Sequence, residues 1–147
     1  MTDRGVSVSV NYVLTLGIAT LLMTTLLFAT GNIVDDRLES STRSELEVVG
    51  ERVASSLMAA DRLAQTGSSV VEVETRAPDR VAGLQYTVTL NATSQQVVLE
   101  TADPEVVVRV PFDNTTAVAE SSASGGRVRI VLADPGGSDE ALEVQSS

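Results

Sequence analysis

Residues 5–34 read GVSVSVNYVLTLGIATLLMTTLLFATGNIV and contain no charged side chain. At about 1.5 Å of rise per residue, a helix of this length exceeds the roughly 30 Å hydrocarbon core of a bilayer. Lipid offers no hydrogen-bond partners to a backbone, and a helix satisfies its own amides. The stretch therefore predicts a membrane-spanning helix, and the residues after it determine the rest of the fold.

The chain after this stretch keeps helical periodicity. Asp35-Asp36-Arg37 introduces charge, and Gly67 with the serines after it is a helix stop signal. Apolar residues recur in register on one face, with Leu63 beside the last of them: Leu38, Leu46, Val49, Val53, Leu57, Ala60 and Ala64. We expect an amphipathic stalk whose later half is covered by a head domain. Its earlier half, around Leu38 and Leu46, is expected to be free to meet another subunit.

From residue 67 onward the apolar periodicity changes from helical to two, which is typical of strands. Five or six short strands are predicted, and residues 113–126 are expected to form a polar loop. The expected strands cover residues 71–76, 84–91, 97–101, 106–112 and 128–132, with a short edge strand at 142–144. Tight turns between them predict an antiparallel meander, one face of which needs covering. The amphipathic helix before it is the available cover.

Composition narrows the range of chemistries. The chain has no Lys, His or Cys. This excludes Ser-His-Asp and Cys-His nucleophiles, Schiff-base lysines, zinc sites built on His or Cys, and disulfides. The net charge of −10 would repel nucleic acid and anionic lipid. We therefore expect no catalytic residue, no cofactor and no nucleic-acid partner, and an enzyme built from carboxylates is only a distant alternative.

The N-terminal residues Met1 to Gly5 allow three interpretations. The first is a secretory signal peptide cut near Ala29-Thr30-Gly31, although the apolar stretch is longer than the usual core of about 7 to 15 residues. The second is an uncleaved anchor with its N-terminus inside. Arginine counts do not settle the orientation, because Arg4 on one side faces Arg37 and Arg43 on the other.

The third interpretation rests on a resemblance. Arg4-Gly5, followed at once by residues 6–10 (VSVSV) and a long apolar helix, resembles the class III leader of archaeal type IV pilins and pilin-like proteins. In that family a prepilin peptidase cuts after the Gly on the cytoplasmic side and leaves the hydrophobic helix on the mature protein. The resemblance implies processing at Arg4, Gly5 and Val6, with the prepilin peptidase and other pilin-like subunits as partners.

Two departures from the family pattern matter. Many bacterial pilins carry Glu at the fifth mature position, which here is Val10, so no subunit-docking role of that carboxylate transfers. The Ser-Pro-Val-Ile-Gly type of opening found in many haloarchaeal pilins is also missing, which favours a minor pilin or pilin-like protein. The acidic, lysine-free composition resembles proteins of salt-loving archaea, where molar salt screens surface charge.

Within the span, small and hydroxylated residues are frequent and would let helices approach closely. The candidate helix-packing residues are Asn11, Gly17, Thr20 and Thr24. Thr20 and Thr24 have small-xxx-small spacing, and the Asn11 amide would seek an interhelical partner or lie at the wet interface. A Thr-rich span without any packing role has the same composition.

The head contains three further patterns. Two sequons, at Asn91 and Asn114, are possible N-glycosylation sites, although a Ser- and Thr-rich chain produces such triplets by chance. A weak Ca²⁺ candidate is formed by Asp134, Asp139 and Glu140, without EF-hand spacing, so no metal site is predicted. The last pattern pairs strand arginines with carboxylates across the sheet, namely Arg127 and Arg129 with Glu105 or Glu143.

The sequence thus predicts an α+β membrane protein in which one long N-terminal helix, first transmembrane and then an amphipathic stalk, packs on a small antiparallel β-sheet head. Its segments are a leader (1–5), a transmembrane or filament-core helix (6–34), a stalk (35–66) and an extracellular β-rich head (67–147). The predicted function is structural: a subunit or accessory pilin of an archaeal type IV pilus-like filament, with its N-terminus cytoplasmic. The alternative is a single-span, membrane-anchored extracellular binding module that forms no filament.

Overall fold

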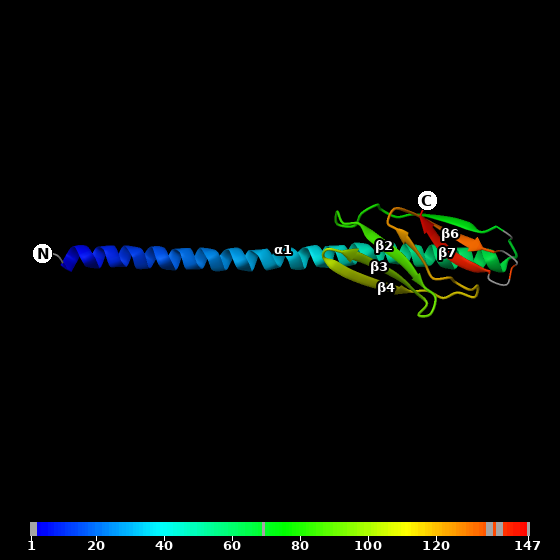
Figure 1. Cartoon of the computed structure of the whole chain (residues 1–147), viewed down its shortest axis with the longest axis horizontal. Coiled ribbons are helices and arrows are strands. Elements are labelled where there is room, and N and C mark those ends of the chain that lie inside the picture. Colours follow the sequence, from blue (N-terminus) through cyan, green and yellow to red (C-terminus); the bar gives the residue numbers. More distant parts are fainter. Residues whose placement is uncertain (1–2, 69, 135–136, 138–139, 147) are drawn as a thin grey trace. The chain divides into compact units, whose positions relative to one another are not determined.

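The computed structural model describes residues 3–68, 70–134, 137 and 140–146, apart from the side chains of residues 3–8 and 30–33. One helix, α1 (Asp3–Gln65), is followed by strands only. The chain divides into two compact units, Met1–Leu38 and Glu39–Ser147. The first unit is helical, and the second contains the rest of α1 together with the strands (Figure 1).

Within the described residues, the second unit contains seven strands in two antiparallel sheets. The three-stranded sheet has the order β1-β6-β7 and the four-stranded sheet has the order β4-β3-β2-β5. The strands are β1 (Glu72–Arg76), β2 (Tyr86–Asn91), β3 (Gln96–Ala102), β4 (Glu105–Pro111), β5 (Ser121–Ser124), β6 (Arg127–Ala133) and β7 (Ala141–Ser146).

This topology corrects two sequence predictions. The predicted single meander is wrong, because β1 pairs with β6, and β5 pairs with β2 instead of with its sequence neighbours. The predicted loop at 113–126 contains β5, whose sequence SSAS has no apolar alternation. Only Ala123 of this strand is buried, so the pattern that marks half-buried strands was nearly absent. The other strands confirm the predicted ones to within one or two residues at each end.

Two serine hydroxyls bridge the sheets where β5 passes β7. The Ser121 hydroxyl accepts the Val144 N–H at 3.0 Å, and the Ser146 hydroxyl accepts the Ser124 N–H at 3.3 Å. The N–H groups of Val144 and Ser124 thus donate to serine side chains here, and not to a carbonyl of a neighbouring strand. The two sheets therefore meet along this seam, and together they pack against the C-terminal part of α1 (Figure 1).

The apolar stripe of the stalk forms the helix side of the core. Leu46, Val53 and Leu57 are fully buried, and the sheet side of the core includes Leu99 and Ile130. The expectation that Leu46 is free to meet another subunit is therefore wrong, since the head covers it. Thr42, which interrupts the stripe, is buried as well.

Gly50 marks the closest approach of α1 to the sheet. A Cβ atom at this position would lie 2.7 Å from Val110 Cγ2 and 2.8 Å from Leu99 Cδ1, which is closer than side-chain carbons pack. A glycine lowers helix propensity, yet here it lets the backbone of α1 contact β3 and β4 side chains directly. The residue at 50 is therefore set by packing.

The free edge of each sheet receives an arginine from α1. Arg43 Nη1 donates to the Val107 carbonyl of β4 at 3.4 Å, and Arg52 Nη1 donates to the Arg76 carbonyl of β1 at 3.3 Å. β4 and β1 are the outer strands of their sheets. The two arginines are nine residues apart, which places them on opposite flanks of a helix with 3.6 residues per turn.

Two turns are explained by their backbone angles. Gly67 has a φ of 79° and donates its N–H to the Ala64 carbonyl at 3.0 Å, so it ends α1 as predicted. Ala82 and Gly83, with φ of 48° and 80°, form a two-residue turn between Val81 and Leu84. The Glu45 carboxylate of α1 accepts the Ala82 N–H at 2.7 Å and ties this turn to the helix.

Candidate functional site

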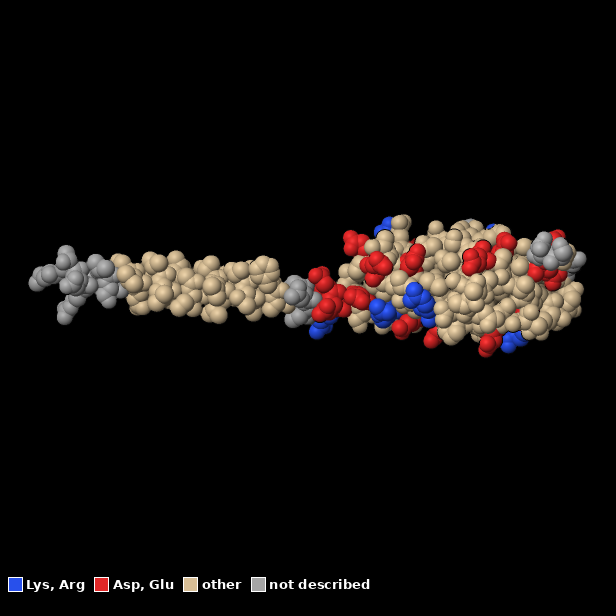
Figure 2. All heavy atoms as spheres, turned by 60° about the horizontal axis from the view of Figure 1, so that its bottom comes forward, with Lys and Arg blue, Asp and Glu red and all other residues tan. Residues whose placement is uncertain are grey.

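The first candidate is the surface of the charge-free half of α1. Every large apolar side chain from Val10 to Phe28 is more than half exposed, between 54% and 73%. Among the described residues this helix alone is long and apolar enough to cross a membrane. Figure 2 shows no charged side chain over this stretch, whereas acidic side chains are spread over the visible face of the head. Exposed leucines on every side of a helix are typical of a segment surrounded by lipid or by other helices.

The threonines of this segment satisfy their own hydroxyl groups. Thr15, Thr20, Thr24 and Thr25 each donate to the carbonyl four residues earlier, at 2.8 to 2.9 Å. A hydroxyl bonded in this way presents its methyl group outward and needs no partner from lipid or from another chain. If Thr20 and Thr24 pack against another helix, as the sequence predicts, they would do so through their small size and not through free donors.

Three of the four candidate packing residues share one helix face. Gly17, Thr20 and Thr24 are spaced by three and four residues, which aligns them along α1. A Cβ atom at Gly17 would meet nothing within 4 Å, and a shallow apolar groove passes over this residue between Val10 and Leu21. Asn11 lies six residues before Gly17 and so on a different face. Of the four predicted packing residues, Gly17, Thr20 and Thr24 could therefore contact one neighbouring helix together, and we call their side of α1 the Gly17 face.

The predicted processing residues lie at the beginning of the same helix. Arg4, Gly5 and Val6 belong to the first turns of α1, and their side chains are outside the described part of the chain. The processing prediction therefore stays a prediction from the sequence.

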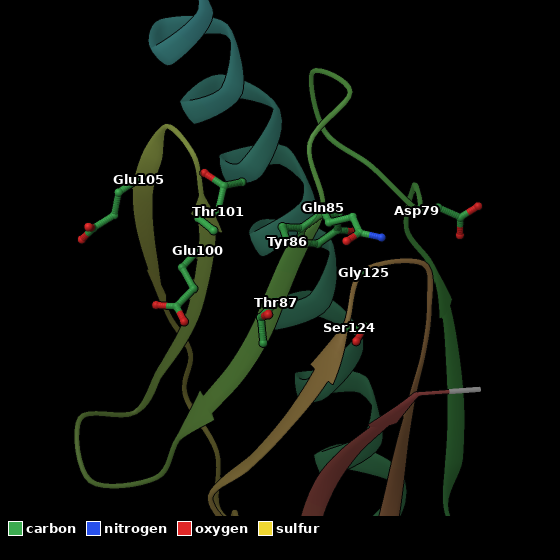
Figure 3. Close-up of a pocket in the computed structure, with 10 residues that line it drawn as sticks. Asp79, Gln85, Tyr86, Thr87, Glu100, Thr101, Glu105, Ser124 and Gly125 are labelled. Carbon is green, nitrogen blue, oxygen red and sulfur yellow. The ribbon is translucent and has the colours of Figure 1, made fainter.

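The second candidate is a cleft of about 510 Å³ in the head, between the ends of β2, β3 and β5. Its walls include Tyr86, Thr87, Glu100, Glu105 and Asp79. Figure 3 shows the carboxylates of Asp79 and Glu105 at opposite ends of the cleft, pointing away from each other. Two carboxylates that act on one bond must face it together, so Asp79 and Glu105 do not form such a pair.

Tyr86 is the buried anchor of this cleft. Its hydroxyl donates to the Pro78 carbonyl at 2.7 Å. The pKa of the Tyr86 phenol is above its ordinary value, chiefly because burial disfavours the charged form. The negative charge of Asp79 raises this pKa further, and a backbone hydrogen bond from Gly126 lowers it in part. Gly125 lies against the ring, and a Cβ atom there would overlap Tyr86 Cε1. The phenol stays protonated at neutral pH and holds the segment before β2.

Asp61 is a buried, hydrogen-bonded carboxylate that the sequence interpretation missed. It is buried near the end of α1, and its Oδ1 accepts the N–H groups of Thr115 and Thr116 at 3.2 and 2.7 Å, while Oδ2 accepts Gln65 Nε2 at 2.6 Å. Burial raises the pKa of Asp61, but these bonds and one from the Thr116 side chain outweigh that effect and leave it below its ordinary value. A charge four residues after Leu57, on the apolar stripe, was the available signal.

The other head predictions have mixed outcomes. Asn91 ends β2, and Asn114 lies in the segment that follows β4. Arg127 and Arg129 lie 3.9 and 3.3 Å from the carboxylates of Glu74 and Glu72. The predicted pairing with carboxylates across the sheet is confirmed, with partners on the neighbouring strand β1 in place of the suggested Glu105 or Glu143.

The weak Ca²⁺ candidate formed by Asp134, Asp139 and Glu140 lies only partly within the described residues. Asp139 lies outside them, while Asp134 and Glu140 lie within them. Throughout the described part of the chain, no group of three or more acidic, His or Cys residues could hold a metal ion.

Comparison with known proteins gives a family without a named activity. No curated protein and no solved structure matches the chain. A family described as a family of unknown function, DUF7266, matches residues 1–145, which covers both the span and the head. The chain therefore belongs to the DUF7266 family.

Proposed function

We propose that this chain is a structural subunit or accessory pilin of an archaeal type IV pilus-like surface filament, anchored and assembled through the charge-free half of α1. The observation that carries the proposal is the continuous exposure of apolar side chains from Val10 to Phe28. A helix of this kind has no stable place in water, because each exposed leucine costs about 1.5 to 3 kcal/mol relative to burial.

The proposed mechanism uses one surface in two environments. In the membrane, lipid surrounds the apolar side chains. In a filament, the same side chains are buried against helices of other subunits, and the open Gly17 face with Thr20 and Thr24 allows close contact. Because the hydroxyls of Thr15, Thr20, Thr24 and Thr25 are already bonded within the helix, the transfer leaves none of these four donors unsatisfied.

The head in this proposal supplies the outer surface of the assembly. Its folding depends on the stalk half of α1, which contributes Leu46, Val53 and Leu57 to the core. A subunit extracted from the membrane would therefore carry its head on the same helix. The acidic surface keeps neighbouring heads soluble, with the head outside the cell and the N-terminus in the cytoplasm.

The N-terminus of the protein from its native membrane tests the processing step. Intact mass and N-terminal peptide mapping are expected to give a mature chain that begins at Val6. A Gly5→Leu variant is expected to keep residues 1–5 and to disappear from the sheared surface-filament fraction while it remains in the membrane. The matched control is Thr2→Ser, which leaves Arg4-Gly5 intact and should behave as the unmodified chain.

Two outcomes would contradict the proposal. A chain that retains residues 2–5, with Gly5→Leu unaffected at the surface, would show that no leader removal is needed. A chain that begins near Asn32 would indicate a secreted domain without the span, and would remove the basis for filament assembly.

The alternative function is a single-span, membrane-anchored binding module. The observation that favours it is the head cleft beside Tyr86, which has both polar and apolar walls. An anchor needs no leader removal, so the Gly5→Leu comparison separates the two functions. A normal surface amount of Gly5→Leu would favour the binding module.

A further inference from the structure

The two sequons of the head lie close together but differ in their hydrogen bonding. Asn91 ends β2 and its sequon runs into the β2–β3 turn, whereas Asn114 follows β4. Gln95, in the same turn as the first sequon, donates its side-chain Nε2 to Asn114 Oδ1 at 3.0 Å. Its carbonyl also accepts the Phe112 N–H at 3.1 Å. Both triplets therefore lie at one end of the head, where their surroundings can be compared directly.

In the Asn114 sequon the groups that a glycosylating enzyme must reach are engaged. Asn114 Nδ2 donates to the Thr116 carbonyl at 2.6 Å, within the triplet itself. The backbone N–H groups of Thr115 and Thr116 donate to Asp61 Oδ1, and the Thr116 side chain hydrogen-bonds the same carboxylate. The acceptor amide and the hydroxyl residue are thus both held by the fold.

In the Asn91 sequon the corresponding groups are not engaged in this way, although Asn91 is half-buried, as Asn114 is. Asn91 Oδ1 accepts the Ser94 N–H at 2.9 Å, which orders the turn and leaves the amide nitrogen out of that bond. Among the described residues none accepts a hydrogen bond from Asn91 Nδ2. Thr93, the hydroxyl residue of this triplet, is exposed. Within the part of the chain that the structure describes, the turn hydrogen-bonds the segment after β4 only through Gln95, and its residues 93–95 are exposed, so a bulky group can be added on that side without disturbing the core.

We infer that Asn91 is the N-glycan acceptor of the folded head and that Asp61 keeps the Asn114 sequon closed to modification. In the reaction, Asn91 Nδ2 attacks the anomeric carbon of a sugar carried on a polyprenyl phosphate lipid. A carbon–nitrogen bond forms as the bond from the anomeric carbon to the phosphate oxygen breaks. The lipid phosphate leaves with the electron pair, and the amide nitrogen loses one proton. The inference rests on the outward-facing head of the proposed function.

Trypsin separates the two sites because the chain has arginine as its only basic residue type. Cleavage after Arg80, Arg109 and Arg127 places Asn91 in the peptide 81–109 and Asn114 in the peptide 110–127. Glycopeptide mass spectrometry of the full chain from its native membrane is expected to find a glycan on the first peptide and none on the second. Thr93→Ala should remove it, whereas Thr93→Ser, which preserves the sequon, should retain it.

Asp61→Ala tests the closed site. Removal of the carboxylate frees the Thr115 and Thr116 amides, so the occupancy of Asn114 is expected to rise several-fold while Asn91 remains modified. If this variant does not accumulate, Gln95→Ala provides a milder test, because it removes only the exposed bond to Asn114 Oδ1. Equal occupancy of both sequons in the unmodified chain, modification at Asn114 alone, or no gain in either variant would overturn the inference.

A cysteine label distinguishes failure of the glycan inference from failure of the proposed topology. The chain has no cysteine, and Val70 is 80% exposed, so Val70→Cys adds one reactive thiol to the head. Labelling of intact cells by a membrane-impermeant maleimide, with no glycan on either peptide, would overturn the glycan inference and leave the outward head in place. A thiol that reacts only after cell lysis would overturn both.

Discussion

The two halves of α1 have similar apolar side chains and opposite surroundings. In the span half, Leu21 and Leu22 are 69% and 63% exposed, while in the stalk half Leu46 and Leu57 are fully buried. The glycines differ in the same way: Gly17 has open space around it, and Gly50 faces Val110 and Leu99. The stalk half of α1 is therefore stabilised by packing within this chain, whereas the apolar side chains of the span half have no such cover from the described residues.

The largest change in head stability is expected when a buried leucine of the stalk is replaced by alanine. Leu57→Ala should lower the free energy of unfolding of the head by about 2 to 5 kcal/mol, because it leaves a cavity between α1 and the sheets. Leu21→Ala is the matched control in the span and should change it by less than about 0.5 kcal/mol. Denaturant unfolding of the full chain in detergent micelles, followed by circular dichroism, measures both. Equal losses of stability in Leu57→Ala and Leu21→Ala would contradict the difference between the buried stalk and the exposed span.

The glycines provide the next test. Gly50→Ala should destabilise the head by about 1 to 3 kcal/mol, because the new methyl group overlaps Val110 and Leu99. A gain in helix propensity of roughly 0.5 to 1 kcal/mol offsets part of this cost. Gly17→Ala should leave head stability unchanged and should instead reduce the yield of filaments, if the Gly17 face packs against another helix. An unchanged thermal midpoint for Gly50→Ala would contradict the close approach.

Asp61 gives a smaller effect with a pH signature. Its folded pKa is lower than its unfolded value, so its stabilisation is complete well above about pH 4 and is lost as the pH falls through the folded pKa. Asp61→Asn should cost about 1 to 2 kcal/mol at pH 7, and the difference from the unmodified chain should shrink below about pH 4. Urea unfolding at a series of pH values measures this difference. A stability difference between Asp61→Asn and the unmodified chain that does not change with pH would show that the ionised Asp61 carboxylate is not the stabilising group.

The smallest effect is expected for an exposed ion pair near the beginning of the stalk. Glu39 and Arg43 form an exposed ion pair with an N–O distance of 3.3 Å, four residues apart on α1. Glu39→Gln should lower the free energy of unfolding by only about 0.2 to 0.5 kcal/mol, and less in high salt. The same unfolding assay at low and molar salt tests it. A loss comparable to that of Leu57→Ala would mean that the head also depends on this exposed turn.

The sequence predicted the parts of the fold that have a local period. The stalk stripe, the Gly67 helix stop and the alternating strands such as β2 were all visible in it. The partition into two sheets was not, because the pairing of Glu72 with Val131 depends on a contact that no local pattern records. The β5 strand was missed because serines form three of its four residues, and their hydroxyl and backbone bonds become visible only beside β7.

The candidate sites were predictable to a different degree. The apolar segment followed from the absence of charge in residues 5–34, whereas the sequence prediction grouped Asn11 with Gly17, Thr20 and Thr24 and did not separate their faces. The sequons were visible as triplets, but their difference was not. Asp61 lies 54 residues before Thr115, so only the folded chain shows that its carboxylate holds the second triplet.

The two α1 arginines that bind the outer strands bear on how copies of the head would interact at high local concentration. An outer strand offers unpaired carbonyls and amides to which another chain can add a strand, and this is a common route to amyloid-like aggregation. Arg43 and Arg52 each bind one such carbonyl and place a positive charge beside it, on β4 and on β1 respectively. Many copies confined to one membrane plane would collide edge to edge at high local concentration. Under the proposed function, the helix that would gather the copies also carries the two arginines that cover one carbonyl on each outer strand.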